Sequence, residues 1–253
     1  MAGKGATTWR EFWNGAHSIY VNDRHKNLHD RLVSGQIADF IPSPGAMVLD
    51  YGCGDTTAAE IVAGRCGELI LLDGASNVRA SLAARYAGDA KIKVISPEDA
   101  ITLPRRSMDL VVANSLLQYL SARELDDLLA TARSLLKPTG TLVIGDVIPP
   151  HVSMIADAAA LLRFGHEGKF LFAAFAGLVR TAFSDYRKLR AKMGLSFHSE
   201  AEVLALLHAS GFIATRRRPN IGHNQSRMTF VARVANGGVA PAEGDPDFVK
   251  ARP

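Results

Sequence analysis

The chain has 253 residues, of which 47% are hydrophobic and 21% charged. These values are typical of a globular protein and exclude a disordered or collagen-like chain. No apolar run is long enough to span a bilayer, and the N-terminal residues lack the apolar core of a signal peptide, so we expect a cytoplasmic protein. Cys53 and Cys66 are too few for a disulfide framework or a zinc site.

The net charge of +4 makes the chain mildly basic, with a pI near 9.2. The densest basic cluster is Arg216, Arg217 and Arg218. Such a cluster is more often a solvated face than a nucleic-acid site. Because no aromatic-rich platform for single strands accompanies it, we do not expect a nucleic-acid partner.

Residues 1–40 are predicted to form a helical N-terminal cap, with Trp9, Phe12 and Trp13 as packing positions. The apolar run 46–49 then indicates a strand buried on both faces. It leads into Asp50-Tyr51-Gly52-Cys53-Gly54. The two glycines allow a ligand to approach the backbone closely. This is not the dinucleotide fingerprint, because Thr57 stands where the third glycine would be.

Strand and helix patterns alternate regularly after this motif. Seven strands are predicted, at residues 47–50, 69–73, 92–95, 110–113, 142–146, 212–216 and 229–234. Helix starts are marked by Ser121 with Glu124 and by Ser199 with Glu202, which form the capping-box pattern. This alternation predicts an α/β fold with a doubly wound, mostly parallel sheet.

Four stretches occur together in a familiar order: the 50–54 motif, a second strand ending in Asp73, Asp99-Ala100 after the third strand, and 135–142 before the fifth. In this order and spacing the chain resembles the class I S-adenosylmethionine-dependent methyltransferases, with a core similar to the ubiquinone/menaquinone methyltransferases. The resemblance implies a Rossmann-like seven-stranded sheet whose last two strands form an antiparallel edge pair. It places the cofactor-binding core at 41–150, completed by 198–235.

The resemblance also implies the cofactor, S-adenosyl-L-methionine, and a role for each motif residue. Asp50 would accept from the ammonium group and Asp73 from the two ribose hydroxyls. Asp99 would accept from the adenine amino group, and the N–H of Ala100 would meet a ring nitrogen. The full set of expected cofactor contacts is Asp50, Gly52, Gly54, Asp73, Asp99, Ala100, Asn114 and Tyr20.

The acceptor should approach over the tips of the fourth and fifth strands, near Tyr119 and Asp146. Many relatives carry histidines in the segment 114–120, but this chain has Gln118-Tyr119. Candidate bases elsewhere are His25, His151 and His223. His25 and His29 are four residues apart, yet no third ligand accompanies them, so no metal site is expected.

Residues 151–197 are predicted to be a helical insertion, with Gly165–Gly168 as a turn before an apolar stripe that includes Phe170, Phe172 and Phe175. A stripe of this kind suits a lid over a hydrophobic or lipid-like acceptor. Packing on the domain core, a homodimer face and a membrane-surface contact remain open as alternatives. Composition predicts a disordered tail at 236–253.

The function indicated is in-line methyl transfer from S-adenosylmethionine to a small acceptor. Methyl transfer depends chiefly on positioning, because the sulfonium already activates the methyl group. Two alternatives belong to other classes: a noncatalytic binding subunit that keeps the fold, and a nucleotide-dependent oxidoreductase. The complete acidic and glycine set argues against the first, and the missing third glycine argues against the second.

Overall fold

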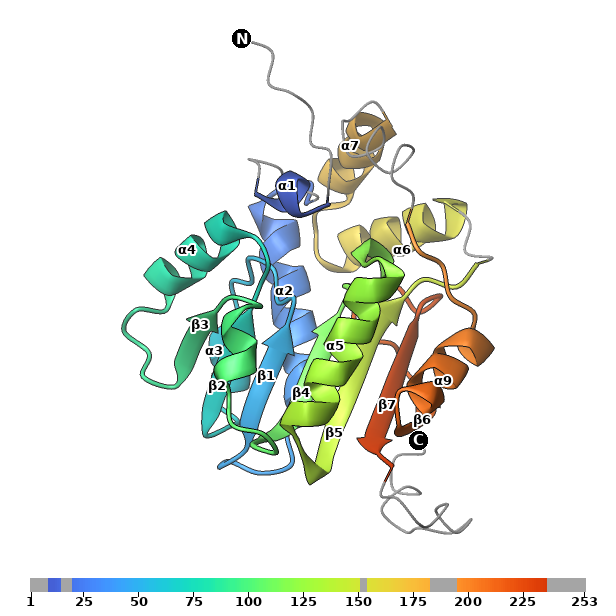
Figure 1. The fold of residues 1–253 in the computed structure, drawn as a ribbon. Helices are drawn as coiled ribbons and strands as arrows, with labels where there is room; N and C mark the ends of the chain where they lie inside the picture. The colour runs from blue at the N-terminus through green and yellow to red at the C-terminus, as the bar shows by residue number, and fades with distance from the viewer. Residues whose placement is uncertain (1–8, 15–19, 151–153, 183–194, 236–253) are drawn as a thin grey trace.

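The computed structural model of the chain describes residues 9–14, 20–150, 154–182 and 195–235. In this part of the chain a single sheet has the strand order β3-β2-β1-β4-β5-β7-β6 (Figure 1). The strands are β1 (Met47–Tyr51), β2 (Glu68–Leu72), β3 (Ile92–Ile95), β4 (Met108–Asn114), β5 (Leu136–Val147), β6 (Phe212–Arg217) and β7 (Met228–Val234).

Strands β1 to β5 pair in parallel, and β7 runs antiparallel to both β5 and β6. The predicted seven-stranded, doubly wound sheet with an antiparallel edge pair is therefore confirmed. Strand β5 begins well before the predicted residue 142, because Leu136 already pairs with Met108 of β4. Strand order reverses between β1 and β4, which is where ligands bind in sheets of this kind.

The sheet separates two layers of apolar packing, because successive residues of a strand point to opposite faces. Leu49, Ile70 and Val111 face one layer, which α5 (Ala122–Leu135) and α9 (Glu200–Ala209) cover. Val48 and Leu110 face the other, which α2 (Asp23–Ala38), α3 (Ala59–Ala63) and α4 (Ser76–Arg85) cover. Both expected capping boxes, at the starts of α5 and α9, are present.

The insertion forms α6 (Met154–Glu167) and α7 (Leu171–Ala182), which lie beside α2 (Figure 1). The predicted turn at 165–168 is wrong in its bounds, since α6 continues to Glu167. Glycine suits position 165 because α7 packs closely against it: an added Cβ would lie 2.9 Å from the Cβ of Ala174. Gly177 packs against Val21, and the Arg24 Nε donates to the Gly168 carbonyl at 2.6 Å.

The N-terminal region contributes a short helix, α1 (Trp9–Trp13), ahead of α2. Two 3₁₀ turns, η1 (Asp99–Thr102) and η2 (Leu117–Tyr119), follow β3 and β4. None of the helices within the described ranges is long and apolar enough to cross a membrane. The tail at 236–253, for which disorder was expected, lies outside the described residues.

Candidate functional site

The loop after β1 is a tight backbone turn that depends on its two glycines. Gly52 has φ of +76° and Gly54 has φ of +62°, values that residues with a side chain rarely adopt. The N–H groups of Gly52 and Cys53 both donate to the Leu72 carbonyl, at 2.7 and 3.1 Å. The loop is thereby tied to the end of β2.

Two carboxylates lie at the tips of adjacent strands on either side of this loop. Asp73 accepts hydrogen bonds from the N–H of Gly54 at 2.9 Å and the N–H of Ala75 at 2.8 Å. Desolvation, and then the charge of Asp73, raise the pKa of Asp50 to about 7. A carboxylate oxygen can accept two hydrogen bonds, so the hydroxyl groups of a ligand are chemically suitable partners for Asp73.

These carboxylates line a cavity of about 990 Å³, a size within the usual range of ligand pockets. Asp50, Gly52, Gly54, Asp73, Asn114 and Tyr20, all expected from the sequence, border it. Another part of the lining is largely aromatic and apolar. It consists of Trp9, Trp13, Tyr20, His29, Leu116, Tyr119 and Leu120, of which Leu116 lies against Gly52 of the glycine loop.

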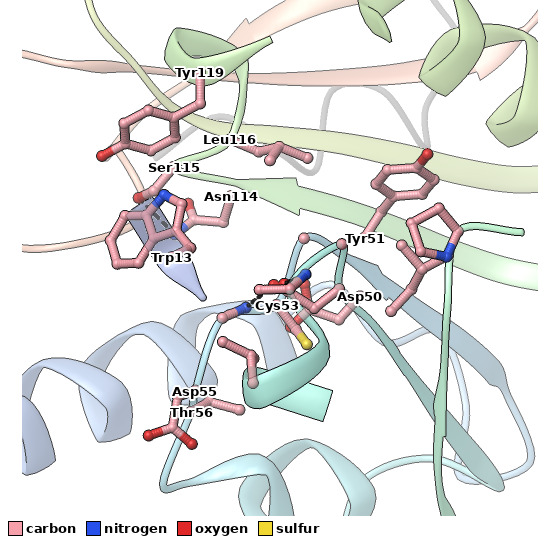
Figure 2. A pocket seen from close by; sticks show the side chains of 18 of the residues that line it. Trp13, Asp50, Tyr51, Cys53, Asp55, Thr56, Asn114, Ser115, Leu116 and Tyr119 are labelled. Atoms are coloured by element: carbon pink, nitrogen blue, oxygen red, sulfur yellow. Dashed lines mark hydrogen bonds between the residues drawn. The ribbon is translucent and has the colours of Figure 1, made fainter. Parts of the chain in front are cut away.

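Helix α1 forms part of this aromatic lining. The rings of Trp9 and Trp13 meet Tyr119 edge to face, with centroids 4.7 and 5.7 Å apart. Figure 2 shows Trp13 and Tyr119 near Ser115, above Asp50 of β1. Asn14, which follows α1, accepts a hydrogen bond from the N–H of Asn77 in α4 at 3.2 Å. This bond joins the end of α1 to α4.

Asp99 and Ala100, which follow β3, do not line the cavity as the sequence predicts. Asp99 is exposed and is absent from the described residues that line the cavity; its carboxylate accepts from Ser96 Oγ and N at 2.8 and 3.1 Å. The N–H of Ala100 donates to the Pro97 carbonyl at 3.2 Å. The Asp99 carboxylate and the Ala100 N–H are therefore both bonded within the turn at residues 96–100. Glu98 and Ile101 border the cavity in their place.

The fourth and fifth strands end in two residues with strained backbones. Ser115 has φ of +54° and Asp146 has φ of +59°, and the Ser115 hydroxyl donates to the Asp146 carboxylate at 2.7 Å. Arg227 donates to the same oxygen at 2.7 Å, and Asn220 bonds to the Asp146 backbone N–H. Non-glycine residues at positive φ are often found at functional sites. Asp146 itself is absent from the described cavity lining.

The candidate histidines gather beside the cavity. His25 stacks on Phe170 with centroids 5.0 Å apart, and His223 stacks on Phe164 at 4.8 Å. Burial, and then the neighbouring histidine, lower the pKa of each imidazole to about 4. Neither His25 nor His223 is among the described lining residues, and His151 lies outside the described residues.

His29 is the histidine that does line the cavity, and it was not among the candidate bases expected from the sequence. Its ring centroid lies 5.5 Å from Tyr20 and 5.7 Å from His223. Burial lowers its pKa, while the charges of Asp146 and Asp30 oppose the shift. The four-residue spacing from His25 indicated a shared helix face, but only the packing of the insertion shows which histidine reaches the cavity.

Other lining residues also lay outside the expected set. Lys26 is paired with Asp30 at 2.9 Å and also contacts Asp55 at 3.8 Å, and all three border the cavity. Among the described residues, no group of three His, Cys, Asp or Glu side chains is placed to hold a metal ion.

Comparison with known proteins agrees with this architecture. Residues 48–140, which include the glycine loop and both acidic tips, match the family described as a methyltransferase domain. Solved structures of methyltransferases match most of this chain. The chain has the class I methyltransferase fold. No curated protein matches the sequence.

Three solved relatives of this methyltransferase fold illustrate the likeness. Haemonchus contortus phosphoethanolamine N-methyltransferase 1, in complex with phosphoethanolamine and S-adenosylhomocysteine, shares 16% identity over 95% of this chain and 51% of its own, with a TM-score of 0.59. Burkholderia thailandensis 1,6-didemethyltoxoflavin-N1-methyltransferase, with 1,6-didemethyltoxoflavin and S-adenosylhomocysteine, shares 16% identity over 85% and 80%, with a TM-score of 0.52. DhpI in complex with S-adenosylhomocysteine shares 15% over 80% and 83%, at 0.51.

Proposed function

We propose that this protein is an S-adenosylmethionine-dependent methyltransferase acting on a small, apolar acceptor. The observation that carries the proposal is one cavity lined by two different kinds of residue. One part of the lining is Asp50, the glycine loop and Asp73, and another is aromatic. The first part fits a cationic, hydroxyl-bearing cofactor, and the solved relatives of this fold are bound to S-adenosylhomocysteine.

The residues of the acidic and glycine-rich lining suit S-adenosylmethionine. Asp50 would hold the ammonium group, and Asp73 the ribose hydroxyls, while the glycine loop lets the ligand lie against the backbone. Tyr20 would close the site from the N-terminal side, and Glu98 would take the place expected for Asp99 near the adenine. When bound, the cofactor supplies a methyl group activated by its sulfonium.

The aromatic lining supports a planar, apolar substrate such as the quinone-type acceptors of ubiquinone and menaquinone methyltransferases. Trp9, Trp13 and Tyr119 offer ring faces and edges, which bind apolar and aromatic groups well. Their role is to hold the acceptor in line with the methyl group, since positioning supplies most of the catalysis.

His29 is the side chain best placed to accept a proton from an acceptor hydroxyl or amine. It lines the cavity, and its lowered pKa keeps the imidazole neutral at pH 7. Asp146, held by Ser115 and Arg227, acts on His29 through its charge. We therefore assign His29 the role of general base and Asp146 that of a positioning residue.

Calorimetric titration with S-adenosylmethionine and S-adenosylhomocysteine tests the cofactor, with NAD as the control. Binding of the first two and not of NAD supports the proposal, and tight NAD binding points to an oxidoreductase. A panel of apolar hydroxylated and aminated aromatic acceptors with labelled methyl donor then tests catalysis. Cofactor binding with no methyl transfer to any acceptor, in a folded sample, favours the noncatalytic binding subunit.

A further inference from the structure

Asp30 of α2 is a buried carboxylate in the wall of the cavity, and it is bonded to two segments that lie apart in the chain. Its Oδ2 accepts from the backbone N–H of Thr57 and from the Thr57 hydroxyl, both at 2.8 Å. The Tyr20 hydroxyl donates to the same carboxylate. Thr57 lies in the loop between β1 and α3 that begins with Gly52, and Tyr20 precedes α2. Asp30 therefore joins the glycine loop to Tyr20 across the helix.

Lys26, one helical turn before Asp30, makes a second link between the same two segments. Its Nζ lies 2.9 Å from Asp30 Oδ2 and also donates to the backbone carbonyl of Asp55 in the loop. The same nitrogen lies 5.6 Å from the centroid of the Tyr20 ring. Residues four apart share a helix face, which explains why both side chains reach the loop and Tyr20.

The bonds to Asp30 have the properties of a rigid support. A hydrogen bond to an ionised carboxylate is stronger than one between neutral groups, and a buried carboxylate is costly if its donors are lost. Burial, and then the charge and hydrogen bond of Asp30, raise the pKa of Tyr20, so its hydroxyl remains a donor at neutral pH. Tyr20, Lys26, Asp30 and Asp55 all line the cavity, so the link runs along its wall.

We propose that Asp30 is a positioning residue that couples the loop at residues 52–57 to Tyr20, so that a cofactor held by the loop is also enclosed by Tyr20. The inference rests on the proposed function, in which the glycine loop and Tyr20 both contact S-adenosylmethionine. Asp30 acts through these two groups rather than on the reacting atoms. Its removal therefore removes the contribution of Tyr20 as well, and the effects of the two substitutions do not add.

The test is a double-mutant cycle on the affinity for S-adenosylhomocysteine, measured by calorimetric titration of the full chain. The cycle uses Asp30→Asn, which removes the charge and keeps the shape, Tyr20→Phe, which removes the hydroxyl, and the two together. Asn27→Ala is the matched control, because Asn27 contacts the same Thr57 hydroxyl at 3.0 Å but does not line the cavity. Chemical denaturation of each variant, without ligand, measures stability separately.

We expect affinity to fall roughly tenfold in Asp30→Asn and about fivefold in Tyr20→Phe, with the double variant no weaker than Asp30→Asn. Asn27→Ala should bind normally, and its combination with Tyr20→Phe should equal Tyr20→Phe alone.

Two results overturn the coupling alone: additive losses in the cycle, or a loss of stability in Asp30→Asn with unchanged affinity, which marks a purely structural role. No binding by the folded unchanged chain overturns the proposed cofactor and the coupling together. If circular dichroism shows that Asp30→Asn is unfolded, Thr57→Val takes its place in the cycle. It removes the hydroxyl contact and leaves the ion pair of Asp30 with Lys26, and it must show the same non-additivity with Tyr20→Phe.

Discussion

The backbone N–H of Gly54 donates to the Asp73 carboxylate at 2.9 Å, which joins the glycine loop after β1 to the acidic tip of β2. The same carboxylate also holds the first turn of α4 through the N–H of Ala75. One side chain therefore fixes two walls of the cavity. This arrangement makes the cofactor site sensitive to single substitutions.

Asp73→Ala should weaken S-adenosylhomocysteine binding by about 2 kcal/mol, or roughly thirtyfold, because a charged acceptor of two hydroxyls is removed. Calorimetric titration measures the change. Asp99→Ala is the matched control, since its exposed carboxylate is bonded to Ser96. An equal loss in Asp99→Ala would restore Asp99 to the adenine role and contradict its placement outside the cavity.

Gly52→Val should abolish detectable cofactor binding while the protein stays folded. A side chain at φ of +76° is strained, and its Cβ would lie 2.7 Å from the Leu116 Cδ2, so both the loop and a lining residue must shift. Titration and circular dichroism report the two effects separately. Gly35→Ala, in α2 with no atom within 4 Å of the new Cβ, should leave binding unchanged. Normal affinity in Gly52→Val would show that the ligand does not lie against this loop.

The affinity for S-adenosylhomocysteine should rise by about tenfold between pH 6 and pH 8. Desolvation and Asp73 raise the pKa of Asp50 to about 7, so the carboxylate that receives the ammonium is mostly protonated at pH 6. Binding a cation favours the ionised form, and affinity is therefore lost as pH falls through 7. Asp50→Asn should remove most of this dependence. A flat profile in the unchanged protein contradicts the assignment of Asp50.

The same shift affects stability with the opposite dependence on pH. The folded protein holds the Asp50 proton more tightly than the unfolded chain does, because the folded pKa is the higher one. The contribution of Asp50 to stability is therefore greatest at low pH, and it falls as the pH rises from about 4 to 7. Denaturation of Asp50→Asn across this range isolates the effect.

Asp146→Ala should destabilise the protein by about 3 kcal/mol, because Arg227 loses its closest anion and the Ser115 hydroxyl loses its acceptor. Chemical denaturation measures the loss. Asp157→Ala removes the more distant partner of Arg227, at 3.5 Å, and the acceptor of the Asn224 side-chain amide, so it should cost less, about 1–2 kcal/mol. Equal effects would mean that the contact of Asp146 with Arg227 is not the main support of this strand end.

Replacing Phe172 and Phe175 with Ser should leave both stability and cofactor affinity unchanged. The two rings are 93% and 63% exposed, and neither is among the described cavity-lining residues, which excludes packing on the domain core. If α7 encloses the acceptor, activity on apolar acceptors should fall severalfold. Phe170→Ala, by contrast, should cost about 3 kcal/mol, since Phe170 is buried against His25.

Light scattering and vesicle co-sedimentation separate the other roles proposed for this face. Loss of a dimer in the Phe172 and Phe175 variant would assign the face to self-association. Loss of binding to anionic vesicles would assign it to a membrane surface. Unchanged activity, mass and vesicle binding would mean that α7 has none of the three roles.

Sequence patterns alone predict the sheet and bring the glycine loop and two acidic residues to one cavity. Both depend on short-range rules: continuous apolar runs mark buried parallel strands, and strand tips meet at one edge of a parallel sheet. Together these rules place Asp50, Gly52, Gly54 and Asp73 at one site. The family likeness of residues 48–140 depends on the same segment.

Only the tertiary structure decided which side chains form the rest of the site. The Asp99 carboxylate is bonded to the nearby Ser96 hydroxyl and does not line the cavity. His29, rather than His25, reaches the cavity. Arg227, just before β7, pairs with Asp146 of β5 at 2.7 Å. Local sequence patterns do not encode these outcomes, because each depends on how elements distant in the chain pack, and packing selects among side chains that share the same local pattern.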